Sequence, residues 1–358
     1  NPGGLLARVT RSGLVESLHT GHLLVAGPDG GAVRAVGDPD VVIWPRSSLK
    51  PLQALALLRA GLDIDDEGLA LACSSHSGTH AHLAVVRRVL AGAGLAERDL
   101  QNTPDLPLDA ASADAWRAAG RGPSSVTQNC SGKHAAMLAT CVAAGWDPVT
   151  YREPDHPLQV LVRDVVGEVT GVPVDRVGVD GCGAPLLSTT VRGLARAFGR
   201  IAAAPRRDRG SDLARVAVAM GARPDLVGGP GRDVSAFLAA VPGLVAKDGA
   251  EGVYAAGLPD GSSVAFKVSD GGARPRAAIL AAALELLLAP RGGADAAGSG
   301  LVANLAAVRA AGRTPVLGHG EPVGEVVAVL DVPGAGPVVG LVAGPVAGAD
   351  SAGTSPIE

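Results

Sequence analysis

The sequence predicts an α/β fold of the α+β kind, with one antiparallel sheet built from both ends of the chain, flanking helices and an inserted helical part. Strand patterns occupy the chain up to about residue 44 and return at about residue 244. Helical patterns dominate the stretch between them. Strands from the two ends of a domain can share one core if they pair in a single sheet, so we expect helices to cover its faces.

The expected elements follow in order. Strands are predicted at residues 5–11, 14–19, 22–26 and 41–44. Helices run from about 47 to 238, with a Pro- and Asp-rich loop at 102–107. Strands return at 244–247, 252–256 and 263–268, and a helix follows at 275–288. A helix near 301–311 and strands near 323–330 and 338–342 complete the order.

These elements predict one catalytic domain over residues 1–342. Its α/β part covers about 1–60 and 240–342, and its helical part covers about 61–239. The stretch from residue 331 is rich in Gly, Ala and Pro, and we expect a mobile tail at 343–358.

Composition indicates a soluble, cytoplasmic protein. Hydrophobic residues make up 47% and aromatic residues only 2%, so the core must consist of Ala, Val and Leu. A net charge of −4 gives no indication of nucleic-acid or membrane binding. The longest apolar run, residues 277–290, contains Glu285 and is shorter than the roughly 20 residues of a spanning helix.

Lysine is rare in this chain. Of 31 basic residues only four are lysine, namely Lys50, Lys133, Lys247 and Lys267. Lysine differs from arginine in having a proton that it can lose when desolvated. Three of the four stand near serine, cysteine or histidine, which favours an enzyme.

The strongest motif is Pro45-Arg46-Ser47-Ser48-Leu49-Lys50-Pro51, at the predicted start of a helix. A spacing of three places Ser47 and Lys50 on one face of the first turn. A neutral Lys50 could take the Ser47 proton, and free N–H groups at the helix start could stabilise the resulting oxyanion. The alternatives are a helix-capping serine with a solvated lysine, or Ser48 as nucleophile, although Ser48 would face another side.

A second polar cluster covers residues 71–82. We expect it to contribute Ser75, or less favourably Ser74, to an active site. A metal site of three histidines is disfavoured because Gly78 interrupts the segment and no Glu follows the first of them; these are His76, His80 and His82. The last two are expected on the exposed side of a helix at 79–90.

Cys130 and Cys182 differ from the other two cysteines because each lies in a polar, glycine-containing loop. Two thiolates, with neutral Lys133 or with His134 and a water, would make a zinc site. A disulfide is the other alternative, disfavoured by the lack of a secretory signal. Cys73 and Cys141 lie in apolar helical runs and are expected in the core.

The last lysine motif is Lys247-Asp248-Gly249, on a predicted strand. Beside a Ser-x-x-Lys helix it is similar to the Lys-Thr-Gly element of serine β-lactamases and penicillin-binding proteins. Lys247 is therefore a second catalytic candidate, whereas Lys267 is assigned to a salt bridge or a solvated face.

Together these segments resemble the Rhizobium-type L-asparaginases, over most of residues 5–330. The resemblance rests on residues 15–19, 46–53, 73–78, 129–134, 180–185 and 247–252. It implies a homodimer with a fold similar to serine β-lactamases and glutaminases. It also implies two pairs, Ser47 with Lys50 and Ser75 with Lys247, beside a zinc ion held by Cys130, Lys133 and Cys182.

The expected reaction is hydrolysis of L-asparagine to L-aspartate and ammonia through a serine ester, with lysines as bases. Which serine is acylated stays open. Zinc is expected to orient the substrate rather than to activate water. Charge complementarity assigns the substrate α-ammonium to Asp180 and the α-carboxylate to Arg46, with a salt bridge as the alternative reading. His134 and Gly249, in the matched motifs, complete the substrate-binding set.

Two rival functions remain. A serine amidase acting on glutamine or a β-lactam would keep Ser47, Lys50 and Lys247. A zinc-dependent amino-acid-binding protein would keep Cys130 and Cys182 but would have no use for the Ser-Lys motif. The presence of both sets favours the enzyme.

Overall fold

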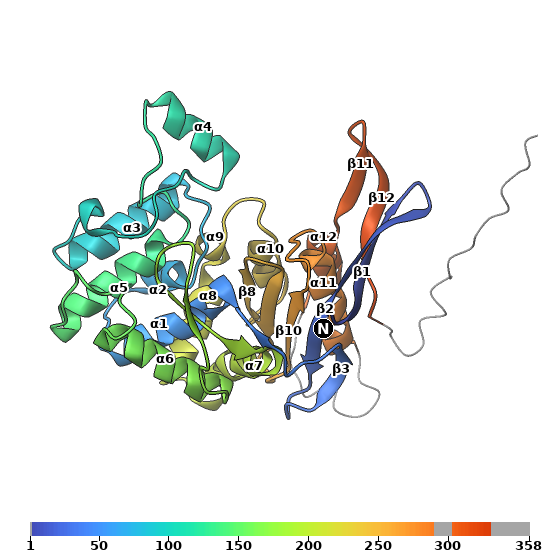
Figure 1. Ribbon diagram of the computed structural model, residues 1–358, viewed down its shortest axis with the longest axis horizontal. Helices are drawn as coiled ribbons and strands as arrows, with labels where there is room; N and C mark the ends of the chain where they lie inside the picture. The colour runs from blue at the N-terminus through green and yellow to red at the C-terminus, as the bar shows by residue number, and fades with distance from the viewer. Residues whose placement is uncertain (1, 290–302, 331–358) are drawn as a thin grey trace, which may run out of the picture.

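The computed structural model describes residues 2–289 and 303–330 (Figure 1). The strand predicted near 338–342 and the tail predicted at 343–358 lie outside the described residues. The predicted α/β fold with an antiparallel sheet is confirmed. In Figure 1 the sheet and the helices that contact it occupy one side, and α1 to α6 occupy the other.

Eight strands of the described residues form the main sheet, in the order β11-β12-β1-β2-β10-β9-β8, with β3 paired to β2. Both ends of the chain contribute, since Ala7 of β1 pairs with Ala328 of β12 and Ala26 of β2 pairs with Ser263 of β10. The strands are β1 (Gly4–Arg11), β2 (Leu14–Ala26), β3 (Ala32–Val36), β8 (Val245–Gly249), β9 (Val253–Gly257), β10 (Ser263–Val268), β11 (Pro315–Gly318) and β12 (Glu321–Ala328).

Two strand predictions need correction. The strands predicted at 14–19 and 22–26 are one strand, β2, because Gly21 keeps its pairing with Val268 instead of ending the strand. The strand predicted at 41–44 is short β4 (Val42–Ile43), which pairs with β7 (Thr189–Thr190) outside the main sheet. A further small ribbon joins β5 (Val177–Val179) and β6 (Pro185–Leu187).

Helices fill the middle of the chain, as predicted. They are α1 (Lys50–Arg59), α2 (Asp66–Ala72), α3 (His80–Gly92), α4 (Ala110–Ala118), α5 (Ser131–Ala144), α6 (Pro157–Thr170), α7 (Val191–Arg207), α8 (Asp212–Ala222), α9 (Pro224–Val227) and α10 (Asp233–Ala240), followed by α11 (Arg276–Leu288) and α12 (Leu305–Gly312). α7 packs on β2, β9 and β10, and α11 packs on β1, β9, β10 and β12. None of the described helices is long and apolar enough to cross a membrane.

A short 3₁₀ turn, η1 (Arg46–Leu49), joins the two parts of the molecule. It leads directly into α1 and packs against β8, which is an edge strand of the main sheet. The Ser48 hydroxyl donates to the Lys247 carbonyl at 3.1 Å. The Ser-x-x-Lys and Lys-x-Gly motifs, about 200 residues apart, thus meet where the helical part contacts the sheet.

Candidate functional site

Three of the four lysines are buried. The exposed fractions are 1% for Lys50, 2% for Lys133 and 0% for Lys247. An ammonium ion is costly to bury unless it is hydrogen-bonded or paired. The partners of these lysines therefore define the site.

Lys50, the first residue of α1, reaches toward the loop that follows α2. Its Nζ lies 2.5 Å from the Ser74 carbonyl, 3.1 Å from the Ser75 hydroxyl and 3.1 Å from the Cys130 sulfur. Within the described residues its Nζ makes no hydrogen bond to Ser47, whereas it bonds the Ser75 hydroxyl. Ser47 lies half-buried in the adjoining turn η1.

Ser74 and Ser75 have different partners. The Ser74 hydroxyl donates to the Leu71 carbonyl at 2.6 Å and so closes the end of α2. The Ser75 hydroxyl accepts a hydrogen bond from Lys50 Nζ instead. Of the two serines left open by the sequence, Ser75 is the one beside a candidate base.

Lys247 lies on β8, and its ammonium donates to both the carbonyl and the carboxylate of Asp248. Burial lowers the pKa of Lys247 to about 8, and the charges on Lys50 and Arg232 act in the same direction, while Asp248 opposes them. The expected Ser75–Lys247 pair is not a direct hydrogen bond among the described residues. A lysine with this pKa exchanges its proton near neutral pH.

Sequence reasoning missed the groups around Asp248. Arg232 donates to the Asp248 carboxylate at 2.8 Å, and Arg276 lies 3.8 Å from it. Burial works to raise the pKa of Asp248, but Lys247 and the two arginines hold it well below its usual range. The only sequence signal was the position of Asp248 beside Lys247, because the arginines are distant in the chain.

The second cluster joins the start of α5 to the turn after β5. Lys133 Nζ lies 3.1 Å from the Cys182 sulfur, and Cys130 precedes α5. A hydrogen bond from Cys130 lowers the pKa of Cys182 to about 5, and Lys133 adds to this effect. The same bond, with burial, raises the pKa of Cys130 to about 12. Burial works to lower the pKa of Lys133, but the two sulfurs outweigh it and raise it.

All four cysteines are free thiols. The donor chemistry of this cluster fits zinc, because two sulfurs and one amine nitrogen converge in a buried position and zinc prefers S and N ligands. Among the described residues, no group of three or more His, Cys, Asp and Glu side chains could hold a metal. Zinc at these cysteines would therefore need Lys133, whose proton a metal ion would displace.

Arg46 and Asp180 form an ion pair of 2.8 Å beside the cysteine cluster. Arg46 has a φ of 53°, a left-handed conformation that a non-glycine residue adopts at a cost. Burial works to raise the pKa of Asp180, but Lys133 and Arg46 lower it below its usual value. The two side chains assigned to opposite ends of a substrate thus lie next to each other.

The other two predicted binding residues are also buried near these groups. His134 Nδ1 bonds the Tyr151 hydroxyl at 2.7 Å, while its Nε2 is buried without a partner among the described residues. Burial, with Lys133, lowers the pKa of His134 well below its usual value, so its imidazole is neutral. Gly249 allows close packing of β8 on η1, because a Cβ there would lie 2.6 Å from the Pro45 carbonyl oxygen.

The histidines of the second polar cluster serve as structural links. His76 Nε2 bonds the Ser131 hydroxyl at 2.8 Å. The expectation that His82 lies on an exposed helix side is wrong, because it is buried, stacks on His76 and meets the Asp225 carbonyl at 3.0 Å. His80 is exposed, as expected.

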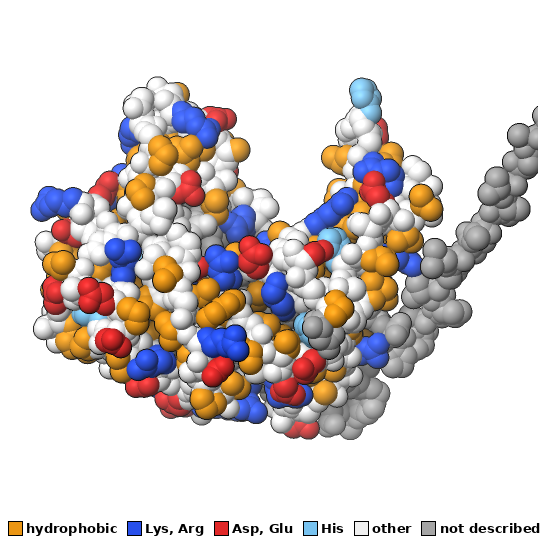
Figure 2. Space-filling view, viewed as in Figure 1, with side chains coloured by type: hydrophobic (Ala, Val, Ile, Leu, Met, Phe, Trp, Pro, Cys, Tyr) orange, Lys and Arg blue, Asp and Glu red, His pale blue; other side chains and the backbone are white. Residues whose placement is uncertain are grey.

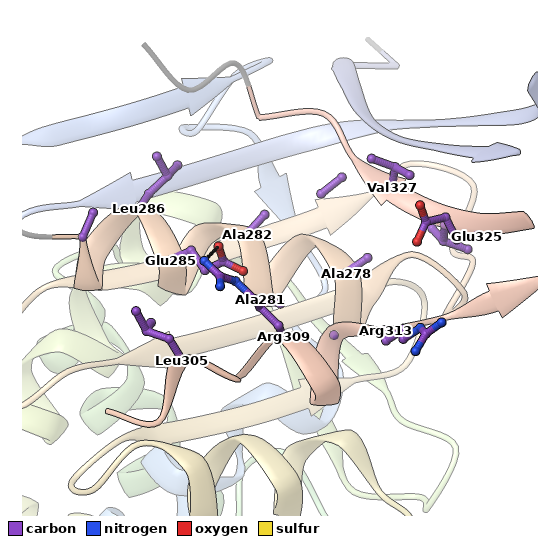
Figure 3. A pocket seen from close by; sticks show the side chains of 14 residues that line it. Ala278, Ala281, Ala282, Glu285, Leu286, Leu305, Arg309, Arg313, Glu325 and Val327 are labelled. Atoms are coloured by element: carbon purple, nitrogen blue, oxygen red, sulfur yellow. Dashed lines mark hydrogen bonds and ion pairs between the residues drawn. The ribbon is translucent and has the colours of Figure 1, made fainter. Parts of the chain in front are cut away.

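The surface offers two hollows of interest. Figure 2 shows one face hollowed between the projection that carries α4 and the β11–β12 hairpin. A separate cavity of about 580 Å³ lies between α11, α12 and β12, and Figure 3 shows the side chains that line it. Alanines line much of the latter, and an ion pair of 3.2 Å joins Arg309 and Glu285 in it. This cavity contains none of the site residues described above.

Comparison with known proteins gives a family match. Residues 7–328 match the family model described as L-asparaginase II. No curated relative matches the chain in a sequence comparison.

Several solved structures are similar. Mglu in its tris and glutamate form is 15% identical, with a TM-score of 0.39 over 76% of this chain and 61% of that chain. A putative β-lactamase from Bacteroides dorei is 16% identical, with a TM-score of 0.39 over 79% and 94%. A β-lactamase from Mycobacterium bovis is 17% identical, with a TM-score of 0.38 over 70% and 88%. The chain thus spans 61% of the length of the Mglu chain.

Proposed function

Because the chain belongs to the L-asparaginase II family, a family of amidohydrolase enzymes, we propose that it hydrolyses L-asparagine to L-aspartate and ammonia. We further propose that it is of the Rhizobium type, with a double serine–lysine site, a zinc ion and a homodimeric active form. One observation carries the proposal, namely the buried Lys50 hydrogen-bonded to Ser75 beside a buried Lys247 whose pKa lies near 8.

The reaction begins with attack by a serine. Two hydroxyls qualify, Ser75 beside Lys50 Nζ and Ser47 in the turn before α1. Lys50 takes the proton of the attacking hydroxyl, and the oxygen forms a bond to the side-chain amide carbon of asparagine. Lys50 then gives this proton to the amide nitrogen, the C–N bond breaks, ammonia leaves, and a β-aspartyl ester of serine remains.

Water completes the cycle. Neutral Lys247 accepts a proton from the attacking water, the ester bond breaks, and Lys247 returns this proton to the serine oxygen as L-aspartate leaves. Lys247 suits this role because its pKa of about 8 leaves a useful neutral fraction near neutral pH. Asp248 accepts a hydrogen bond from Lys247 Nζ through its carboxylate and so holds the Lys247 side chain in place.

Substrate binding uses the Arg46–Asp180 pair. The substrate α-carboxylate takes the place of Asp180 at Arg46, and its α-ammonium takes the place of Arg46 at Asp180. Binding breaks the Arg46–Asp180 ion pair and forms two new ion pairs with the substrate. The charged groups of the zwitterion are therefore paired when they leave water, which limits the desolvation cost. The free Nε2 of His134 supplies a further hydrogen bond, and Gly249 leaves room for the backbone contact between β8 and η1.

Cys130, Lys133 and Cys182 would hold the zinc ion. When bound, the metal would supply a fixed positive charge that orients the substrate. The protein residues alone account for each proton transfer given above.

The test is ammonia release from L-asparagine and from L-glutamine, with zinc content measured on each sample. We expect release that is selective for asparagine and lost in both Ser47→Ala and Ser75→Ala. Ser112→Ala, in the projecting helix α4, is the control and should keep wild-type activity. Preference for glutamine would favour the related amidase, and no release from folded, zinc-loaded protein would overturn the enzyme proposal.

A further inference from the structure

Arg232 contacts both halves of the candidate site. One guanidinium nitrogen donates to the Ser75 carbonyl at 3.1 Å, and the other terminal nitrogen donates to Asp248 Oδ2 at 2.8 Å. The opposite oxygen of Asp248, Oδ1, accepts from Lys247. A continuous path of hydrogen bonds therefore runs from the serine loop through Arg232 and Asp248 to Lys247.

The segment that carries Arg232 is also attached to the serine loop. The backbone N–H and the hydroxyl of Ser77 both donate to the Gly228 carbonyl at 2.9 Å. Gly229, with a φ of 128°, approaches Ser77 closely. Arg232 follows in the same turn, immediately before α10. One backbone hydrogen bond, one hydrogen bond from the Ser77 hydroxyl and the Arg232 guanidinium thus fix this turn against the Ser75 loop.

We propose that Arg232 is a positioning residue that holds the Ser75 loop and the Lys247 strand at the separation the reaction needs. This inference rests on the proposed function. Arg232 does not contact the reacting atoms. It acts through the Ser75 backbone and through Asp248.

Arginine is suited to this position because its planar fork presents several donors in fixed directions. A lysine offers one ammonium group and could not meet the Ser75 carbonyl and the Asp248 carboxylate in the same way. The charged groups that face Lys247 are Asp248 on its own strand, Lys50 from α1 and Arg232 before α10, and Arg276 of α11 reaches Asp248.

Loss of the Arg232 charge should also affect proton transfer. Its positive charge disfavours protonation of Lys247, so a neutral side chain at position 232 should raise the pKa of Lys247. Replacement by lysine keeps the positive charge but loses the two simultaneous hydrogen bonds that the guanidinium donates to Ser75 and Asp248. The two variants therefore separate the electrostatic effect from the geometric one.

The experiment compares Arg232→Met and Arg232→Lys with Arg223→Met. Arg223 is a matched control, since its side chain is 30% exposed against 23% for Arg232, and it pairs with Asp225 and Glu67 rather than with the site. Two quantities are measured for each protein across pH: kcat and KM for ammonia release from L-asparagine, and the Lys247 titration by NMR of ¹³Cε-labelled lysine. The chain has only four lysines, which makes the spectrum assignable.

We expect Arg232→Met to lower kcat about tenfold or more, with little change in KM, and to move the Lys247 midpoint upward by about half a pH unit or more. Arg232→Lys should lower kcat and leave the midpoint near the wild-type value. A wild-type midpoint in Arg232→Met, or equal losses in Arg223→Met, would overturn the proposal. Absence of turnover in the wild-type protein would reject the proposed function, and the NMR titration would still test the bridge.

Discussion

At the residue scale, burial and partners give each lysine of the site a different character. Lys247 has a pKa lowered to about 8 by burial, whereas the pKa of Lys133 is raised because two sulfurs outweigh its burial. Lys50 lies between a serine hydroxyl and a cysteine sulfur. The three buried lysines thus have different partners: Asp248 for Lys247, the cysteine sulfurs for Lys133, and a serine hydroxyl with a cysteine sulfur for Lys50.

The first prediction concerns pH. Because Lys247 must be neutral to accept a proton from the attacking water, kcat should rise as pH increases toward 8 and level off above it. The rise should approach about tenfold per pH unit well below the pKa. A pH profile of the wild type, with Lys247→Met and the half-buried Lys267→Met, measures this. Lys267→Met should keep the profile, and a flat wild-type profile below pH 8 would contradict the role of Lys247.

The same shift has a consequence for stability. The folded-state pKa of Lys247 lies below its usual value of 10.5, so the unfolded chain binds more protons between about 8 and 10.5. Lys247 should therefore make the folding free energy more favourable as pH rises through that window. Denaturant unfolding of wild type and Lys247→Met at both ends of the window measures the difference, which should be absent in the variant.

A third prediction separates two adjacent serines. Ser75→Ala should lower kcat/KM by about 10³-fold or more, because it removes the hydroxyl at Lys50. Ser74→Ala should cost less than about tenfold, since its hydroxyl serves only the Leu71 carbonyl. Steady-state kinetics of both variants measures the two losses of kcat/KM. An equal loss in the two variants would contradict a catalytic role for Ser75.

At the scale of elements, the site depends on the packing of η1 against β8. Gly249 permits this packing, with its Cβ position only 2.6 Å from the Pro45 carbonyl oxygen and 3.0 Å from the Ser48 hydroxyl. The motif Lys-x-Gly therefore needs glycine for a steric reason. The sequence showed that residue but not the contact that requires it.

We predict that Gly249→Ala separates η1 from β8. It should destabilise the protein by about 1–3 kcal/mol and lower kcat, because the added methyl group has no room. Gly221→Ala is the control, since its Cβ would meet nothing within 4 Å in α8 and helical alanine is stabilising by up to about 1 kcal/mol. Thermal unfolding with kinetics compares the two, and wild-type behaviour of Gly249→Ala would refute the packing argument.

The sequence predicted the elements of the fold better than the contacts between them. Periodicity and glycine positions predicted most strands and helices, and the rarity of lysine pointed to the three residues that the fold buries. Spacing along one helix suggested the Ser47–Lys50 pair, yet Lys50 meets Ser75 across a long-range contact. Arg232 and the burial of His82 by α9 were not predictable, because both depend on how distant elements pack.

At the scale of the whole molecule, the fold brings segments from across the chain to one junction. The sheet joins both ends of the described chain, and its edge strand β8 meets the helical part. The cysteine cluster makes a second connection, between the start of α5 and the turn after β5. A metal ion at this cluster would link these two elements.

We therefore predict that zinc stabilises the folded protein. Chelation should lower Tm by about 5 °C or more. A ligand present at a concentration well above its Kd adds several kcal/mol to the free energy of unfolding, and chelation removes this contribution. Cys182→Ala should bind less zinc and lose the response to chelator, whereas Cys141→Ala, with its buried thiol away from the cluster, should keep it. Metal analysis and calorimetry measure both effects, and a Tm unaffected by chelation of the zinc-loaded wild type would argue against the site.

The central claim is that a serine of this junction carries the acyl group during amide hydrolysis. The most direct measurement is rapid quenching of the wild-type protein with L-asparagine, followed by peptide mapping of the modified residue by mass spectrometry. The account predicts a β-aspartyl ester on Ser47 or Ser75. Ammonia release with no acylated serine at either position would contradict it.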